Sequence, residues 1–164
     1  MANLITITQG SGKVSKKDNP DWNLTTENPV IYNEALFDAG TEGMNIIKLS
    51  SRIPPNTNVI KKKINFINLY EGHELKVVES REYATEKGQK AVAGLGWMLS
   101  NDNAGYFIEI QGKSEKEVAY SIQLTLEKFR ANKIKQYPYL DMVIESVECN
   151  SDNEPVCALV QAVY

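Results

Sequence analysis

The chain has 164 residues, 42% of them hydrophobic and 24% charged, which suits one domain spanning 1–164 and excludes a disordered or fibrous protein. Its formal net charge is −3, so no overall basic field exists to hold nucleic acid or an acidic membrane surface. No apolar run approaches the roughly 20 residues of a membrane span, and the first ten residues lack a signal-peptide pattern. We therefore expect a cytoplasmic protein with no nucleic-acid or membrane partner.

Regular segments and polar loops alternate at the start of the chain. Residues 4–8 alternate Ile and Thr, which is typical of a strand, and the polar stretch 9–28 predicts a long loop. A helix is expected over 29–39, because proline is tolerated in a first turn and Gly40 can end the helix.

A serine pair follows the next predicted strand. The apolar stretch 44–49 predicts that strand, and it runs directly into Ser50 and Ser51. Pro54 and Pro55 then prevent further ladder pairing, since proline has no N–H to donate. A serine dipeptide alone most often marks a turn, but a polar pair at this break has no evident packing role.

Strands and one amphipathic helix are expected in the rest of the chain. Turn residues bound five further predicted strands, which are 74–83, 89–99, 106–111, 141–149 and 155–164. The first three are expected to form one sheet. Ser114 and Glu117 form a capping box that begins a helix ending near residue 133. Its buried stripe is expected at Val118, Ile122, Leu126 and Phe129. This order of elements predicts an α/β layered domain (α+β) with mostly antiparallel pairing.

Cysteine, histidine and glycine patterns offer little chemistry. Cys149 and Cys157 flank a turn and could face each other across a hairpin, but two buried free thiols are favoured in a reducing compartment. The chain has one histidine and no metal-binding spacing, so no metal is expected. A serine or cysteine hydrolase would rest on His73 alone, for which a strand-edge position is the favoured interpretation. The glycines at 94 and 96 favour close backbone packing over phosphate binding.

Two stretches carry a family resemblance. Residues 45–55 hold Asn, two aliphatic residues, Lys, Leu, Ser-Ser and then Pro-Pro, after a helix that ends in Ala-Gly. Residues 105–113 place Glu109 in a strand ahead of Gly-Lys and a helix. Both patterns resemble the pyruvoyl-dependent arginine decarboxylase family, over about 29–164. The resemblance implies that family's fold, a layered α/β/β/α sandwich.

The resemblance also implies a proenzyme that cuts itself between Ser50 and Ser51, giving a beta chain, 1–50, and an alpha chain, 51–164. The Ser51 hydroxyl attacks the Ser50 carbonyl, and the resulting ester is eliminated to leave a pyruvoyl group derived from Ser51. That covalently bound group would replace pyridoxal phosphate, because its ketone condenses with a substrate amine and accepts electrons as carbon dioxide leaves. No metal or pyridoxal phosphate is implied.

The family's catalytic residues map onto two further positions. Glu109 corresponds to the acid that protonates the substrate α-carbon. A solvent-facing strand residue is the alternative for this position, since Glu109 points away from the face of its two isoleucine neighbours. Asn45 corresponds to the asparagine that holds substrate and the processing site, with a turn residue as its alternative.

The chain departs from the family at Asn33, which occupies the position where the family has the aspartate that receives a guanidinium group. An amide lacks the charge that makes this interaction strong. Asp38 or Glu42 could supply a carboxylate, as could Glu34, although Glu34 and Asp38 could simply form an exposed helix face. Arginine, giving agmatine and carbon dioxide, is the first choice, and another cationic amino acid or histidine the second.

The resemblance further implies a homotrimer with active sites between subunits, or a dimer of trimers. A different class remains open: an unprocessed relative that binds a small ligand as a regulatory or structural module.

Overall fold

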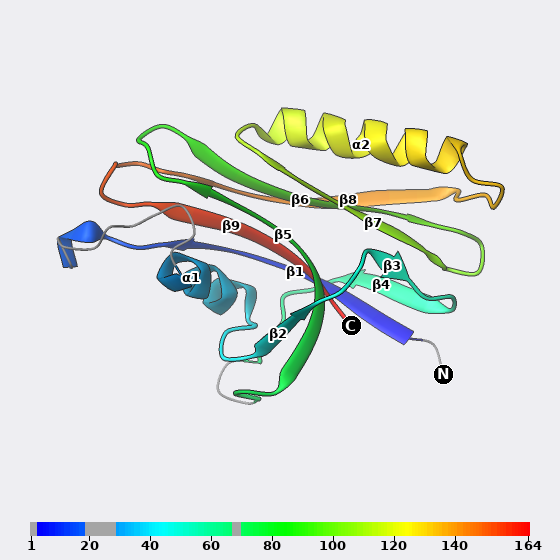
Figure 1. Ribbon diagram of the computed structural model, residues 1–164, viewed down its shortest axis with the longest axis horizontal. Helices are drawn as coiled ribbons and strands as arrows, with labels where there is room; N and C mark the ends of the chain where they lie inside the picture. Colours follow the sequence, from blue (N-terminus) through cyan, green and yellow to red (C-terminus); the bar gives the residue numbers. More distant parts are fainter. Residues whose placement is uncertain (1–2, 19–28, 67–69) are drawn as a thin grey trace.

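Two β-sheets pack face to face in the computed structural model, which describes residues 3–18, 29–66 and 70–164 (Figure 1). Helix α2 lies on the outer face of one sheet, and α1 lies on the outer face of the other. The elements in chain order are β1 (Asn3–Lys13), a 3-10 turn η1 (Lys16–Asp18), α1 (Pro29–Ala39), β2 (Asn45–Lys48), β3 (Arg52–Ile53), β4 (Thr57–Lys61), β5 (Glu74–Ala84), β6 (Lys90–Leu99), β7 (Gly105–Gly112), α2 (Glu115–Ala131), β8 (Tyr139–Glu148) and β9 (Val156–Val163). The expected α/β/β/α layering is confirmed.

One sheet has five strands in the order β2-β5-β9-β1-β4, and the other has four in the order β3-β7-β6-β8. The pairs β1–β4 and β2–β5 are parallel, and the remaining pairs are antiparallel. The expectation that 74–83, 89–99 and 106–111 share a sheet is wrong, because β5 belongs to the five-stranded sheet. β6 is buried on both faces, because α2 covers one face and the five-stranded sheet covers the opposite face.

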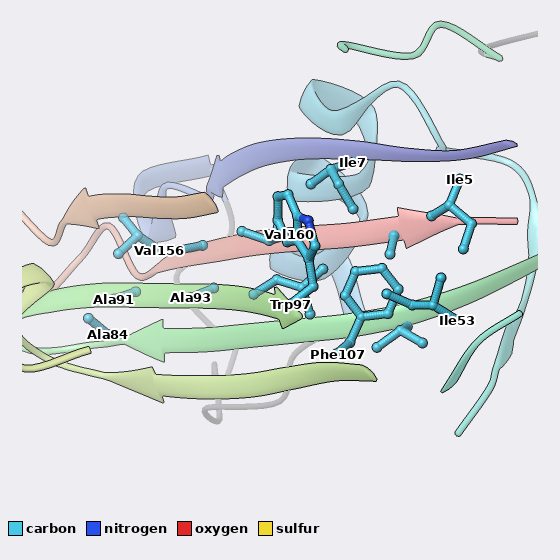
Figure 2. Close-up of a cluster of buried hydrophobic side chains, with 14 of the residues drawn as sticks. Ile5, Ile7, Ile53, Ala84, Ala91, Ala93, Trp97, Phe107, Val156 and Val160 are labelled. Carbon is cyan, nitrogen blue, oxygen red and sulfur yellow. The ribbon is translucent and has the colours of Figure 1, made fainter. Parts of the chain in front are cut away.

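The main core lies between the two sheets (Figure 2). Large side chains fill the part of it around Trp97 and Phe107, whose rings meet edge to face with centroids 6.1 Å apart. Ile53 of β3 packs into the same cluster and is 3% exposed. Burying a side chain of this size stabilises the fold by about 1.5–3 kcal/mol. Ile53 therefore anchors β3, the strand that directly follows the serine pair, and Phe107 anchors its partner strand β7.

Helix α2 has the N-cap and the buried stripe that the sequence predicts. Ser114 is the N-cap, and its hydroxyl accepts a hydrogen bond from the Glu117 N–H at 3.4 Å. The stripe expected on its buried face packs on the four-stranded sheet. A Cβ on Gly94 would lie 2.6 Å from Ile122 Cδ1, and one on Gly96 would lie 2.2 Å from Ile122 Cγ2. These two glycines serve close packing, as expected.

The expected loop over 9–28 is wrong in its first part, because β1 continues to Lys13. Gly10 and Gly12 suggest a loop by composition, but in β1 they form a flat surface on which α1 rests. The 3-10 turn follows, and 19–28 lie outside the described residues. Both cysteines are buried and free. Cys149 packs between the sheets and Cys157 packs under α1, so they lie in different layers.

Replacing Gly10 with Ala should destabilise the fold by about 1–3 kcal/mol, because overpacking of a close contact forces the backbone to shift. The new Cβ would lie 2.3 Å from Ala39 N and 2.6 Å from Ala35 O. Urea unfolding measures the effect, with Ser11→Ala as the neighbouring control, expected to change stability by less than about 0.5 kcal/mol. Equal unfolding midpoints for both variants would contradict the tight α1–β1 contact.

Across the described ranges, no helix combines the length and the apolar character needed to cross a bilayer.

Candidate active site

The serine pair lies where the chain passes from one sheet to the other. β2 belongs to the five-stranded sheet, and its pairing with β5 is extended by Leu49 N–H, which donates to Val77 O at 2.8 Å. Three residues later, Arg52 pairs with Tyr106 in the four-stranded sheet. Ser50 and Ser51 therefore form the crossover between the sheets. The sequence predicts only that a strand ends at this point.

Ser51 and Glu109 are in direct contact. The Ser51 hydroxyl donates a hydrogen bond to Glu109 Oε1, across 58 residues of sequence. Strand alternation explains the meeting, since Glu109 shares a face of β7 with buried Phe107 two residues before it. Ser51 likewise precedes buried Ile53 by two residues. Both polar side chains are partly buried. A carboxylate that accepts from a serine hydroxyl is placed to take its proton.

Backbone donors hold both carbonyls of the serine pair. Arg52 N–H donates to Ser50 O at 2.7 Å, and Phe107 N–H donates to Ser51 O at 3.1 Å. Tyr164, which follows β9, donates its hydroxyl to Arg52 O at 2.5 Å. A hydrogen bond to a carbonyl oxygen stabilises the charge that develops there during attack on its carbon. The arrangement thus combines a polarised Ser50 carbonyl, an oriented Ser51 hydroxyl and a carboxylate base.

Sequence reasoning missed these three donors. Backbone N–H groups carry no residue signature, and the hydrogen bond of Tyr164 spans 112 residues. A lone tyrosine at the end of an apolar strand gives no local sign of such a partner.

Asn45 is the first residue of β2, at the end of the strand away from the serine pair of the same protomer. Its N–H donates to His73 O at 2.8 Å, and it pairs with Glu74 at the start of β5. Four residues of extended chain, about 13 Å, separate it from Leu49. The structure therefore does not bring Asn45 to Ser51 of the same chain. His73 is at that same distant end, so a Ser-His hydrolase arrangement is not formed in the protomer.

The predicted substrate residues are on and just after α1, in the outer layer of the sandwich. Asn33 is exposed. Asp38 is already engaged, since Oδ1 lies 2.6 Å from Lys63 Nζ and Oδ2 accepts from Ser11 N–H at 2.9 Å. Burial raises the pKa of Asp38, but these two interactions outweigh it and leave the pKa below its usual range. Glu42 makes no side-chain hydrogen bond or ion pair with any described residue.

A buried carboxylate links α1 to the strand that precedes the serines. Glu79 has no exposed side-chain surface, and its Oε1 lies 2.9 Å from Lys48 Nζ of β2. Its Oε2 accepts from Tyr32 Oη of α1 at 2.6 Å and from Gln161 Nε2 at 2.9 Å. Burial raises the pKa of Glu79, but these partners outweigh it and the pKa stays below its usual value. The network explains the basic residue in the motif: Lys48 neutralises a buried charge.

The protein is an α/β/β/α sandwich with a serine–carboxylate pair at the point where the chain crosses between its sheets. The family model described as pyruvoyl-dependent arginine decarboxylase matches residues 4–164. The chain belongs to the pyruvoyl-dependent arginine decarboxylase family.

Curated relatives agree with this assignment. A pyruvoyl-dependent arginine decarboxylase of Methanocella arvoryzae is 32% identical over 89 residues, covering 52% of this chain and 54% of that protein. Pyruvoyl-dependent arginine decarboxylase 1 of Archaeoglobus fulgidus is 27% identical over 113 residues, 62% of this chain and 72% of that protein. The protein of that name from Methanosarcina acetivorans is 30% identical over 94 residues, 56% of this chain and 57% of that protein. The chain thus spans about half the length of the first of these relatives.

Proposed function

We propose that this chain cuts itself between Ser50 and Ser51, carries a pyruvoyl group made from Ser51, and decarboxylates an amino acid, with arginine as its substrate. The observation that carries the proposal is the hydrogen bond from the Ser51 hydroxyl to Glu109. Family membership supports the same chemistry, because the description of the family names pyruvoyl-dependent decarboxylation of arginine.

The proposed cut uses groups already in contact. Glu109 accepts the hydroxyl proton as Ser51 Oγ bonds to the Ser50 carbonyl carbon, while Arg52 N–H stabilises the negative charge on Ser50 O. The C–N bond between Ser50 and Ser51 breaks as the amine takes a proton, which leaves an ester. Loss of the Ser51 α-proton and departure of the Ser50 carboxylate give a dehydroalanine. Water then replaces its nitrogen, which leaves as ammonia, and the ketone remains.

The residues around Ser51 fit a pyruvoyl group at this position. When present, that group supplies a ketone for the substrate amine and an adjacent amide carbonyl that accepts electrons. That amide carbonyl is the Ser51 carbonyl, whose oxygen accepts a hydrogen bond from Phe107 N–H at 3.1 Å. This donor would stabilise the negative charge that the carbonyl oxygen accepts. Glu109 remains beside the reacting carbon after the cut. We assign to it the proton that is delivered to the substrate α-carbon.

Substrate choice is tested by measuring carbon dioxide release from arginine, lysine, ornithine and histidine with protein shown to be cut. We expect arginine to react fastest, and agmatine to be its product. The printed names of the relatives support arginine. Asn33 is proposed to contact the far end of the substrate as a hydrogen-bond acceptor. Glu42 supplies the charge, because Asp38 is already paired with Lys63. Faster release from histidine or ornithine would overturn the arginine assignment.

A second copy of the chain is proposed to complete each active site in a homotrimer, which could pair into a dimer of trimers. Asn45, Asn33 and Glu42 are not brought to Ser51 in one protomer, so their proposed roles require a neighbour that presents them.

Mixed variants test this arrangement. Asn45→Ala and Ser51→Ala proteins should each be almost inactive alone. Co-expressed, they should regain roughly a quarter to a third of wild-type carbon dioxide release, because some sites then combine an intact Asn45 with an intact Ser51 from different chains. Co-expression of Ser51→Ala with Glu109→Gln is the control, since those residues meet within one protomer. Mixtures as inactive as the single variants would place Asn45 outside a shared site.

The alternative of an unprocessed ligand-binding module is favoured only by Asn33, which lacks the charge of the family's aspartate. Denaturing mass spectrometry of the wild-type chain separates the two functions, because the enzyme yields fragments 1–50 and 51–164 and the module stays whole.

A further inference from the structure

Tyr164 connects the five-stranded sheet to the short strand that follows the serine pair. Its backbone N–H donates to Lys76 O at 3.0 Å, which continues the pairing of β9 with β5. Its side chain packs against the core between the sheets, and its hydroxyl donates to Arg52 O at 2.5 Å. Arg52 belongs to β3 and hence to the four-stranded sheet. The tyrosine therefore spans the two sheets one residue beyond Ser51.

The proposed cut would remove a covalent connection at this point. β2 runs into Ser50 and is held by β5, whereas β3 consists of Arg52 and Ile53 alone. Breaking the Ser50–Ser51 bond also removes the acceptor that Arg52 N–H uses in the uncut chain. A two-residue strand at a new chain end has few hydrogen bonds to hold it. The hydroxyl of Tyr164 acts on the carbonyl of Arg52, which the cut leaves unchanged.

One contact of the Arg52 side chain and the protonation state of Tyr164 both favour this hydrogen bond. Its guanidinium lies over the Tyr106 ring at 4.4 Å from the centroid, on the outer face of β7. Burial first, and then the nearby Glu109 carboxylate, raise the pKa of Tyr164 to about 12. The phenol therefore keeps its proton, and remains a donor, throughout the neutral pH range.

We propose that Tyr164 is a positioning residue that ties the Ser51–Arg52 peptide to the five-stranded sheet, both before the chain is cut and afterwards. This inference rests on the proposed function for its catalytic consequence. The hydrogen bond from the Tyr164 hydroxyl to Arg52 O, here called the tether, is present in the uncut chain. Before the cut it keeps the Ser51 hydroxyl on Glu109. After the cut it keeps the group made from Ser51 within reach of the same carboxylate.

Tyr164→Phe removes only the hydroxyl and keeps the packed ring. Loss of one hydrogen bond of this kind should slow the cut by about 3- to 10-fold and lower kcat by a similar factor. KM should stay within about twofold, because Tyr164 is proposed to act on the reacting group and not on substrate binding. Tyr139→Phe is the matched control, since Tyr139 is 59% exposed and its hydroxyl makes no hydrogen bond with any described residue. It should cut and turn over like wild type.

A second measurement works without any cutting. In a Ser51→Ala background, amide hydrogen exchange of peptides covering residues 49–54 should be about 3- to 10-fold faster with Tyr164→Phe than without it. Exchange in α2 serves as the internal control and should not change.

The outcomes separate the tether from the proposed function. Unchanged exchange, or a Tyr164→Phe protein that cuts and turns over at the wild-type rate, would overturn the tether alone. A proportional loss of kcat and rise of KM would also overturn it, because that pattern indicates a general disturbance of the site. A wild-type chain that stays whole would remove the proposed function, while the exchange comparison would still decide the tether.

Discussion

Ser51→Ala should leave the chain in one piece, whereas the wild-type chain should resolve into fragments 1–50 and 51–164 under denaturing conditions. The substitution removes the hydroxyl that contacts Glu109 and that is placed to attack the Ser50 carbonyl. We expect complete loss of the cut, because the proposed nucleophile is gone and the pyruvoyl group forms from Ser51 itself. Intact-mass spectrometry gives the result directly, and carbon dioxide release should be lost with it.

Ser50→Ala is the control for this experiment. Ser50 contributes its backbone carbonyl to the proposed reaction, and its exposed hydroxyl makes no hydrogen bond with a described residue. The variant should therefore still be cut at the same bond. A Ser51→Ala chain that is cut, or a Ser50→Ala chain that is not, would show that the bond or the nucleophile has been assigned wrongly.

Glu109→Gln should lower carbon dioxide release by about 100-fold or more in protein that has been cut, which is the usual size of a lost general acid. The amide can still accept a hydrogen bond from the Ser51 hydroxyl but cannot take or give a proton. We therefore expect the variant to be cut, though more slowly than wild type. Single-turnover measurement on the cut fraction separates the two effects.

Glu148→Gln is a suitable carboxylate control, because Glu148 is an exposed residue at the end of β8. It should show wild-type cutting and turnover. Full carbon dioxide release from cut Glu109→Gln protein would remove Glu109 from the decarboxylation step, leaving it at most a role in the cut.

The regular elements were predictable wherever the chain carries a strong local signal. The limits of α1 match the expectation of 29–39, because Pro29 and Gly40 mark both ends. β5 to β9 fall within a few residues of the predicted stretches, since turn residues bound each of them. β3 and β4 were not predicted. β3 has two residues and shows no periodicity, so only its pairing with β7 makes it a strand.

The types of group at the site are readable in the amino-acid sequence: a serine pair at the end of a strand, a glutamate in a later strand, and an asparagine where the family has an aspartate. Which of these groups meet depends on how the chain folds. Glu109 contacts Ser51, Asn45 lies at the far end of β2, and Tyr164 reaches Arg52. This difference arises because residue patterns act over a few positions, whereas the register between distant strands is set by how two sheets pack around Phe107, Ile53 and their neighbours.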